Sequence, residues 1–332
     1  MLNEGEMLMK KSLIALAVAG AMTAPMVAQA DATLYGSFRA ELHSVDDADL
    51  DLKDGSTRIG IKGDVDLGLE STKGLFHWEA NVNITDKGGY GADMFAPRLS
   101  YLGATGNWGT ALVGRQYHPH YLLINLTTGI FDTASSTTGE WNQLGNDVHK
   151  REDNTVAYHS PVMGGFQFIG GAVIAGNNDD ADGVADSEVD GYNVAVKYNA
   201  NDLYVAASYG DVQEDVFGTV SDKETWGVAA SYKIADFGLA AKYEEQEDGV
   251  NDETAWELAG TYDIGATQLM ARYSDYENDV NGAEGNQWAV GVMHKLGGKG
   301  RVWVNYFDFD SDAQNVNANF RDALVLGYRV DF

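Results

Sequence analysis

The second half of the chain repeats one pattern of apolar and polar residues. About ten residues alternate between the two kinds, a short turn follows, about ten more alternate, and a longer polar segment precedes the next repeat. In the first repeat, Tyr192, Val194, Val196 and Tyr198 share one parity, and Leu203 opens the next strand after a tight turn. Because side chains alternate between the two faces of a β-strand, this period of two predicts hairpins with one apolar face.

Aromatic residues recur at two levels of that apolar face. Trp226, Trp256 and Trp288 each open an ascending strand, and Tyr232 and Tyr262 lie six residues further along the first two. At the rise of a β-strand, the two levels are about 20 Å apart. Soluble β-sandwiches rarely repeat aromatic residues at both ends of strand after strand, whereas membrane-spanning barrels carry such aromatic girdles. The pattern therefore favours a membrane barrel.

Along the whole chain, the same alternation predicts an all-β, antiparallel transmembrane barrel of about 16 strands. Polar, mostly acidic segments separate the hairpins, at 177–190, 211–224, 244–254, 275–286 and 308–322. Short turns at one rim and long loops at the other are typical of outer-membrane barrels, with the long loops outside the cell. The strands are expected near Thr33, Arg58, Phe76, Arg98, Thr110, Thr155, Phe166, Tyr192, Leu203, Trp226, Phe237, Trp256, Leu269, Trp288, Val302 and Leu324.

The two ends of the chain predict export and outer-membrane assembly. Residues 1–30 have the order of a secretory signal peptide: Lys10 and Lys11, an apolar run, and a small-residue cleavage site ending at Ala30. Residues 31–332 then form one mature domain. At the other end, alternating apolar residues lead to Phe332 as the last residue. A terminal Phe of this kind looks like the recognition signal that outer-membrane barrels present to their assembly machinery.

Composition narrows the possible functions. The formal net charge is −28, and cysteine is absent, so neither a nucleic-acid partner nor a disulfide framework is expected. The sequence holds no G-x-S-x-G, Walker A, H-E-x-x-H or dinucleotide motif, so we expect no cofactor and no enzyme activity. An outer-membrane barrel enzyme is the alternative from another class, and it needs a Ser/His or Asp/His set converging on one rim.

Short blocks in the first half of the mature chain resemble the successive motifs of the Gram-negative general porins. They are 32–36 (ATLYG), 56–63 (STRIGIKG), 107–110 (NWGT), 114–116 (GRQ) and 154–161 (NTVAYHSP). The resemblance implies a 16-stranded barrel, usually a homotrimer, that passes small hydrophilic solutes. It also implies a third extracellular loop folded into the lumen. A channel specific for one solute is the alternative within the same fold. The acidic loops suggest contact with outer-membrane lipid and lipopolysaccharide, with divalent cations as bridges.

The segment 117–151 breaks the hairpin rhythm and is the predicted pore-constricting loop. Its acidic candidates are Asp132, Glu140 and Asp147. Parity places Arg39, Arg58, Lys62 and Arg98 on the lumen face, Arg115 is assigned there by the resemblance alone, and Arg151 lies where the loop returns to the wall.

Opposed acidic and basic walls across a narrow aqueous gap set up a transverse field that disfavours apolar or bulky solutes. Ala157 stands where the family often carries another wall arginine, which thins the basic side unless Arg151 substitutes. Together with the acidic mouth, this predicts a preference for cations.

Two candidate metal sites are set aside. His118 and His120 flank a proline but lack the further ligands of a recognised motif, so we interpret them as solvent-exposed loop residues. Asn178, Asp180 and Asp182 imitate the start of a calcium-binding loop, but Val189 stands where that motif needs Glu. No metal site is predicted.

Overall fold

The computed structural model describes residues 31–85, 95–133, 150–174, 189–212, 222–316 and 320–332, most of them in β-strands. The predicted signal peptide lies outside this range. No helix among the described residues is both long and apolar enough to cross a membrane. The strands are β1 Asp31–Val45, β2 Asp51–Asp54, β3 Arg58–Leu69, β4 Thr72–Val82, β5 Phe95–Gly106, β6 Gly109–Tyr117, β7 Arg151–His159, β8 Phe166–Val173, β9 Gly191–Ala200, β10 Leu203–Val212, β11 Lys223–Ile234, β12 Phe237–Glu247, β13 Asp252–Ile264, β14 Thr267–Asn278, β15 Ala283–Lys295, β16 Gly300–Phe309 and β17 Ala323–Asp331.

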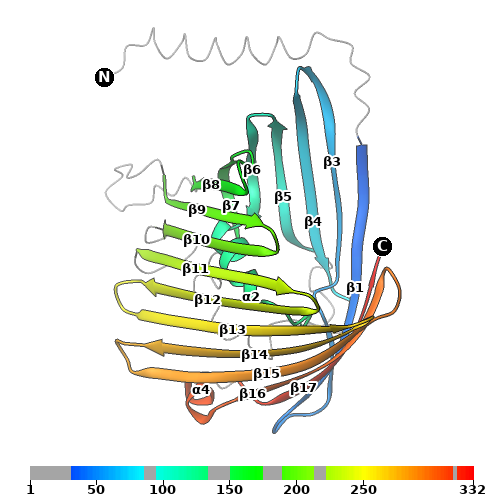
Figure 1. Cartoon of the computed structure of the whole chain (residues 1–332), viewed down its shortest axis with the longest axis vertical. Helices are drawn as coiled ribbons and strands as arrows, with labels where there is room; N and C mark the ends of the chain where they lie inside the picture. Colours follow the sequence, from blue (N-terminus) through cyan, green and yellow to red (C-terminus); the bar gives the residue numbers. More distant parts are fainter. Residues whose placement is uncertain (1–30, 86–94, 134–149, 175–188, 213–221, 317–319) are drawn as a thin grey trace.

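These strands form one closed antiparallel sheet. Each strand from β3 to β17 pairs with the next in the chain, and β17 pairs back onto β1 from Ser37↔Asp331 to Val45↔Ala323. The short β2 pairs with the C-terminal half of β1, and β3 pairs with its N-terminal half, so β2 and β3 together make one strand of the wall. Figure 1 shows the chain following the wall in sequence order until its C-terminus returns beside β1. The predicted 16-stranded barrel is confirmed, and each predicted strand centre lies in a separate strand.

The turns at one rim are short because their residues accept left-handed backbone conformations. Asn201 and Asp202, which join β9 to β10, have φ values of 52° and 63°, and Ala235 has 50° in the turn between β11 and β12. Two consecutive residues with positive φ match the twist of an antiparallel hairpin and allow a two-residue connection.

At the opposite rim, the predictions of two long loops are wrong. Strand pairing continues to Glu247↔Asp252 and to Asn278↔Ala283, so four-residue turns replace the loops predicted at 244–254 and 275–286. Both faces of these strand ends are polar, which removes the alternation although the backbone pairing persists. In the first turn, the Asp248 carboxylate accepts hydrogen bonds from the backbone N–H groups of Val250 and Asn251.

The outer face of the barrel is apolar and carries the predicted aromatic residues. Leu34 and Leu102 expose more than 60% of their surface. Trp226, Trp256 and Trp288 lie on this face, and each ring centroid is 5.3–5.5 Å from that of a tyrosine on the next strand. Tyr232 and Tyr262 are exposed nearer the short turns, and Tyr262 stacks on Phe237 at 4.4 Å. An apolar exterior is the inverse of a soluble protein's surface and fits burial in lipid.

The last residue closes the seam of the barrel. The Phe332 backbone N–H donates to the carbonyl of Gly36 at 3.1 Å, and the Gly36 N–H donates back to Phe332 at 3.3 Å. The Phe332 ring stacks on Phe38, with the ring centroids 5.8 Å apart. A side chain on Gly36 would collide with the Phe332 ring, because an added Cβ would lie 2.4 Å from it. The terminal aromatic residue is thus fitted into the first strand.

Candidate functional site

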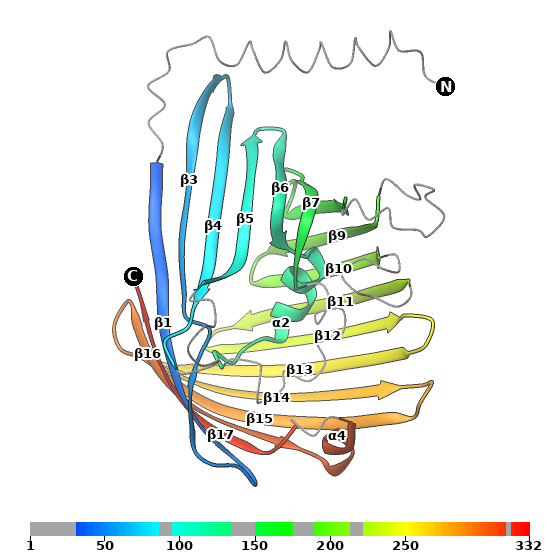
Figure 2. The ribbon, with the colours of Figure 1, turned by 180° about the vertical axis from the view of Figure 1, so that it is seen from behind.

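The segment between β6 and β7 turns into the barrel. Its first described part forms a π-helix, Tyr121–Asn125, followed by the short helix α2, Leu126–Thr128. Both contact the inner side of the β10–β13 wall, and Figure 2 shows α2 against the inner side of that wall. Gly227 lets the segment approach closely, because a Cβ there would lie 2.8 Å from the His120 ring. We refer to residues 118–133 as the inward segment.

Buried polar contacts anchor the inward segment to this wall. The Glu244 carboxylate lies 2.9 Å from His120 Nε2 and accepts a hydrogen bond from Asn125 Nδ2 at 2.6 Å. Lys242 Nζ lies 2.9 Å from the other Glu244 oxygen and 3.8 Å from Glu257. Glu257 in turn accepts a hydrogen bond from the Thr128 hydroxyl. These carboxylates expose 2% of their surface or less. Charges this deeply buried are tolerated because each has a partner of opposite charge.

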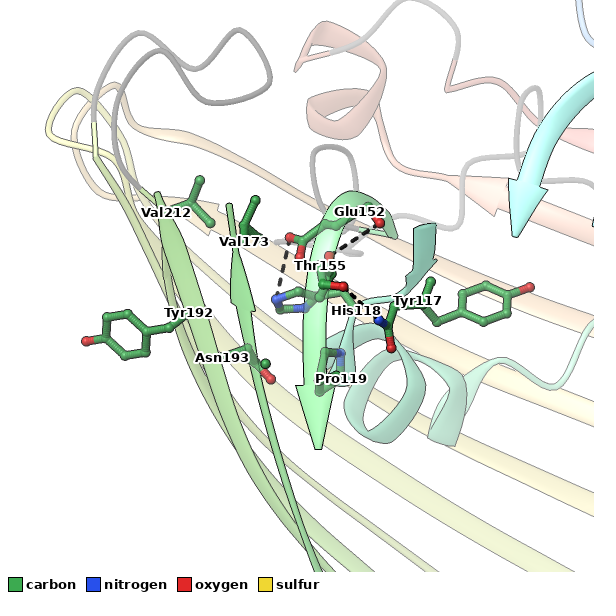
Figure 3. A pocket seen from close by; sticks show the side chains of 12 residues that line it. Tyr117, His118, Pro119, Glu152, Thr155, Val173, Tyr192, Asn193 and Val212 are labelled. Carbon is green, nitrogen blue, oxygen red and sulfur yellow. Dashed lines mark hydrogen bonds and ion pairs between the residues drawn. The ribbon is translucent and has the colours of Figure 1, made fainter. Parts of the chain in front are cut away.

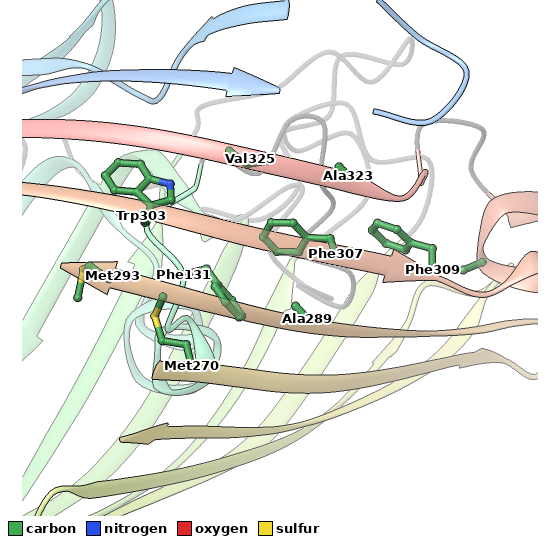
Figure 4. Close-up of a cluster of buried hydrophobic side chains, with 10 residues drawn as sticks. Phe131, Met270, Ala289, Met293, Trp303, Phe307, Phe309, Ala323 and Val325 are labelled. Atoms are coloured by element: carbon green, nitrogen blue, oxygen red, sulfur yellow. The ribbon is translucent and has the colours of Figure 1, made fainter. Parts of the chain in front are cut away.

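Apolar packing extends the anchor. Leu123 and Ile124 pack against the alanines Ala206 and Ala229 of the wall. Further along, Phe131 packs edge-to-face on Phe307, 5.4 Å between ring centroids, and the Arg272 guanidinium lies 5.4 Å above the Phe131 ring. Figure 4 shows Phe131 beside Met270 and Ala289, among side chains of β14–β17. The inward segment therefore follows one side of the barrel interior.

Asp132, at the end of the described inward segment, binds three arginines of the wall. Its carboxylate oxygens lie 3.0 Å from Arg39 on β1, 3.0 Å from Arg329 on β17 and 3.3 Å from Arg301 on β16. Asp331 also contacts Arg301 and Arg329, at 3.1 and 2.6 Å. Asp132 is thus in direct contact with its basic partners, instead of facing them across an aqueous gap.

A second group of cations lies on the wall formed by β3–β7. Arg98 donates to Glu79 at 2.5 Å and to the Tyr117 hydroxyl at 3.1 Å. Arg151 lies over the Tyr117 ring at 4.9 Å. Arg58 donates to the Ser56 carbonyl at 3.3 Å, and its side chain contacts no carboxylate among the described residues. We refer to β1 and β3–β7 as the open wall, since the inward segment packs on β10–β13 through its helices and on β14–β17 through Phe131.

The predicted site residues therefore fall into separate groups. Arg39 meets Asp132, whereas Arg58, Lys62, Arg98 and Arg151 lie on the open wall away from that contact. Glu140 and Asp147 lie outside the described residues, as does the calcium-like segment at 178–183.

The structure also separates Arg115 from the other arginines. Arg115 pairs with Asp153 at 2.7 Å, beside a register shift between β6 and β7, and shares the parity of Val113, which is 48% exposed. Geometry thus favours the outer face of the wall for Arg115, against the inward assignment.

Arg301 and Arg329 were missed, although the sequence carries the signal for both. Arg329 stands between Tyr328 and Val330 in a strand whose apolar parity is clear, so its side chain must face the lumen. Arg301 has the parity of Trp303 and Asn305, which are buried inside the barrel. The same period-two reading that selected Arg39 would have selected both.

The interpretation of His118 and His120 as exposed residues is wrong. They expose 5% and 1% of their surface, because the segment that carries them packs on the wall. His118 Nε2 lies 3.7 Å from Glu152 and helps to line a small cavity, shown in Figure 3, from which the Tyr117 ring points away. Among the described residues there is no group of three or more His, Cys, Asp or Glu side chains that could hold a metal ion.

A closed barrel with an apolar exterior, a charged interior and an inward segment defines an outer-membrane channel. The family model described as "Gram-negative porin" matches residues 15–314, and the chain belongs to this family. The chain is 30% identical to outer membrane porin protein 32 of Delftia acidovorans over 249 residues, 70% of this chain and 67% of that protein. It is 25% identical to chitoporin of Vibrio furnissii over 281 residues, 73% and 75% of the two chains.

Solved structures show the same fold at lower sequence identity. An anion-selective porin from Comamonas acidovorans matches with a TM-score of 0.74 and 17% identity, covering 92% of this chain and all of that chain. Salmonella typhi OmpF in complex with daunomycin matches with a TM-score of 0.72 and 17% identity, over 91% and 97% of the two chains.

Proposed function

We propose that this outer-membrane porin is a general diffusion channel for small hydrophilic solutes and ions. The observation that carries the proposal is the one-sided course of the inward segment, whose helices pack on β10–β13. On the wall of β3–β7, Lys62 is exposed, and Arg58 and Arg151 are partly exposed. An aqueous passage lined on one side by cations and hydroxyl groups passes polar solutes and disfavours apolar ones.

Liposome swelling with sugars of graded size tests this proposal. General diffusion predicts that the swelling rate falls smoothly as the sugar becomes larger. One sugar that enters far faster than its size allows would instead indicate a solute-specific channel. Enzyme activity forms no part of the proposal.

The ion preference depends on which charges act on the permeating ion. The net charge of −28 and the acidic segments between strands enrich cations at the mouth, which supports the predicted cation preference. Inside, the guanidinium groups of Arg39, Arg58, Arg98, Arg151, Arg301 and Arg329 outnumber the neighbouring carboxylates of Glu41, Glu79, Asp132 and Asp331. This lining favours anions, and the solved porin from Comamonas acidovorans is described as anion-selective.

Ionic strength separates these two contributions. Solvent-exposed charges at the mouth are screened over a Debye length of about 30 Å at 0.01 M salt and about 3 Å at 1 M, whereas partly buried charges are screened less. We therefore expect cation preference at low salt that weakens, and then reverses, as salt increases. Reversal potentials across KCl gradients in planar bilayers measure this directly. A preference that does not change with salt, or that shifts toward cations, contradicts the proposal.

The proposal includes a homotrimer and export through the predicted signal peptide of residues 1–30. A structural neighbour, OmpT of Vibrio cholerae, is described in a trimer form and matches with a TM-score of 0.69 and 19% identity. A trimer should migrate on SDS gels as a large species that converts to monomer on boiling.

Within this assembly, Trp226, Tyr232, Trp256, Tyr262 and Trp288 would lie at the two lipid–water interfaces, and Phe332 would be recognised by the assembly machinery. Lipopolysaccharide, bridged by divalent cations, would contact the acidic loops.

A further inference from the structure

A continuous row of aromatic side chains runs along the inner face of the open wall. Tyr35 on β1, His77 on β4 and Tyr101 on β5 have ring centroids 5.8 and 5.1 Å apart in succession. The Tyr35 hydroxyl lies 2.5 Å from His77 Nε2, and the Tyr101 hydroxyl lies 2.8 Å from His77 Nδ1. Hydrogen bonds on both ring nitrogens fix the imidazole between its two neighbours. We refer to Tyr35, His77 and Tyr101 as the aromatic row.

The aromatic row faces the lumen. Leu34, Trp78 and Leu102, the chain neighbours of its three members, are 62%, 42% and 65% exposed on the outer face. Because neighbouring residues of a strand point to opposite faces, the row points inward. Its three rings are partly exposed, in contrast to the buried carboxylates beneath the inward segment, so a solute in the lumen can reach them.

Cations accompany the aromatic side chains along this wall. Lys62 Nζ lies 5.1 Å from the Tyr35 ring centroid and contacts no carboxylate among the described residues. Nearer the loop between β6 and β7, Arg151 lies over the Tyr117 ring, which stacks on Tyr121 of the inward segment with the ring centroids 5.5 Å apart. The Glu79 oxygens beside the row are already used, one by Arg98 and the other by the Tyr35 hydroxyl. The charged groups left for a solute on this wall are therefore hydrogen-bond donors.

We propose that the aromatic row and Lys62 form a binding track for aromatic carboxylates on their way through the channel. The planar ring of the solute stacks on Tyr35 or Tyr101, and its carboxylate pairs with the Lys62 ammonium group. A neutral sugar also stacks on aromatic rings, but its hydroxyl groups need acceptors as well as donors, and Glu79 is engaged. The inference deepens the proposed function and rests on it, since the solute must first enter an open lumen.

The experiment compares benzoate with cyclohexanecarboxylate, which has the same charge and similar size but no planar π-system. Purified full-length protein is placed in planar bilayers in KCl, and each carboxylate is titrated until the channel current falls by half. Stacking on the aromatic row predicts a half-blocking concentration about three- to tenfold lower for benzoate. Equal concentrations for the two solutes would overturn the inference, and this comparison needs no mutant.

Four variants locate the effect. A double variant with Tyr35→Leu and Tyr101→Leu should abolish the difference between the two carboxylates, and a double variant with Tyr35→Phe and Tyr101→Phe, which keeps both rings, should retain it. Lys62→Gln should weaken block by both carboxylates equally, whereas Lys233→Gln, at the rim with the short turns, should leave both values unchanged. A benzoate advantage that survives the double leucine variant with normal KCl conductance also overturns the inference. Wild-type protein that gives no KCl conductance at all would instead contradict the porin function.

Discussion

The two sides of the barrel interior show the same alternation of residues, but their lumen-facing charged side chains differ in burial. On β12 and β13, lumen-facing Lys242, Glu244 and Glu257 are 4% exposed or less and form a closed set of ion pairs beneath the inward segment. On β3, lumen-facing Lys62 remains exposed. Strand parity decides which face a residue occupies, but the path of the inward segment decides whether that residue anchors a loop or meets a solute. The following predictions test this division.

Substitution of Glu244, whose carboxylate contacts His120, Asn125 and Lys242, is expected to cause the largest loss of stability. Glu244→Ala leaves the Lys242 ammonium group buried without its closest counter-charge, which should lower the free energy of unfolding by about 3–5 kcal/mol. Detachment of the inward segment should also make the single-channel conductance fluctuate. Urea unfolding and single-channel recordings measure the two effects. The control is Glu247→Gln at the exposed end of β12, and equal losses for both variants would refute the anchoring role.

A smaller loss is expected at Thr128, whose hydroxyl donates to buried Glu257. Thr128→Val removes that hydrogen bond at nearly constant volume and should cost about 1–3 kcal/mol, because Glu257 stays buried with one donor fewer. Thr127→Val is the matched control, since the Thr127 hydroxyl donates to the carbonyl of Leu123 at 2.9 Å and meets the neutral Tyr204 side chain of β10 instead of a buried carboxylate. If Thr127→Val proves the more costly substitution, the hydrogen bond to Glu257 is not what holds α2.

The third prediction concerns the boundary between the two sides, where Asp132 binds Arg39, Arg301 and Arg329. Asp132→Asn removes the central negative charge and should raise the chloride-to-potassium permeability ratio about threefold, as expected for one charge at an effective dielectric constant between those of protein and water. Reversal potentials across a KCl gradient provide the measurement. Asp153→Asn, which removes the partner of Arg115, should leave the ratio unchanged, and a shift toward cations in Asp132→Asn would contradict the assignment.

The smallest effect is expected at the turn between β12 and β13. Burial alone would raise the pKa of Asp248, but hydrogen bonds from the Asn251 side chain and from the backbone N–H groups of Val250 and Asn251 lower it below its usual range. Because the pKa is lower in the folded state, the stabilisation is present above the unfolded-state pKa of about 3.9 and is lost as pH falls through the folded-state value.

For this exposed turn the stabilisation should not exceed about 0.5 kcal/mol. Asp248→Asn should remove this part of the pH dependence of unfolding between about pH 5 and 2. An unchanged profile in Asp248→Asn would show that the turn does not depend on the charge.

The strands could be predicted from the sequence because a two-residue period is a local signal that recurs in every hairpin. The same signal failed at 244–254 and 275–286, where both strand faces are polar and only the backbone pairing continues. The same alternation also places Arg301 and Arg329 on the lumen face, although both were overlooked. The anchors could not be found in this way, since Glu244 and Glu257 meet partners more than 115 residues away in the sequence. The burial of His118 and His120 likewise depends on the path of the inward segment.

The central claim, that solutes pass along the open wall and not beneath the inward segment, can be tested by cysteine accessibility. The chain has no cysteine, so single substitutions provide clean probes. Lys62→Cys places a thiol on the open wall, and Ser274→Cys is nearly isosteric at a position that is fully buried beside Glu257. A bulky thiol reagent added to open channels should rapidly lower the conductance of Lys62→Cys and leave Ser274→Cys unchanged. Faster modification of Ser274→Cys, with Lys62→Cys unaffected, would contradict the account.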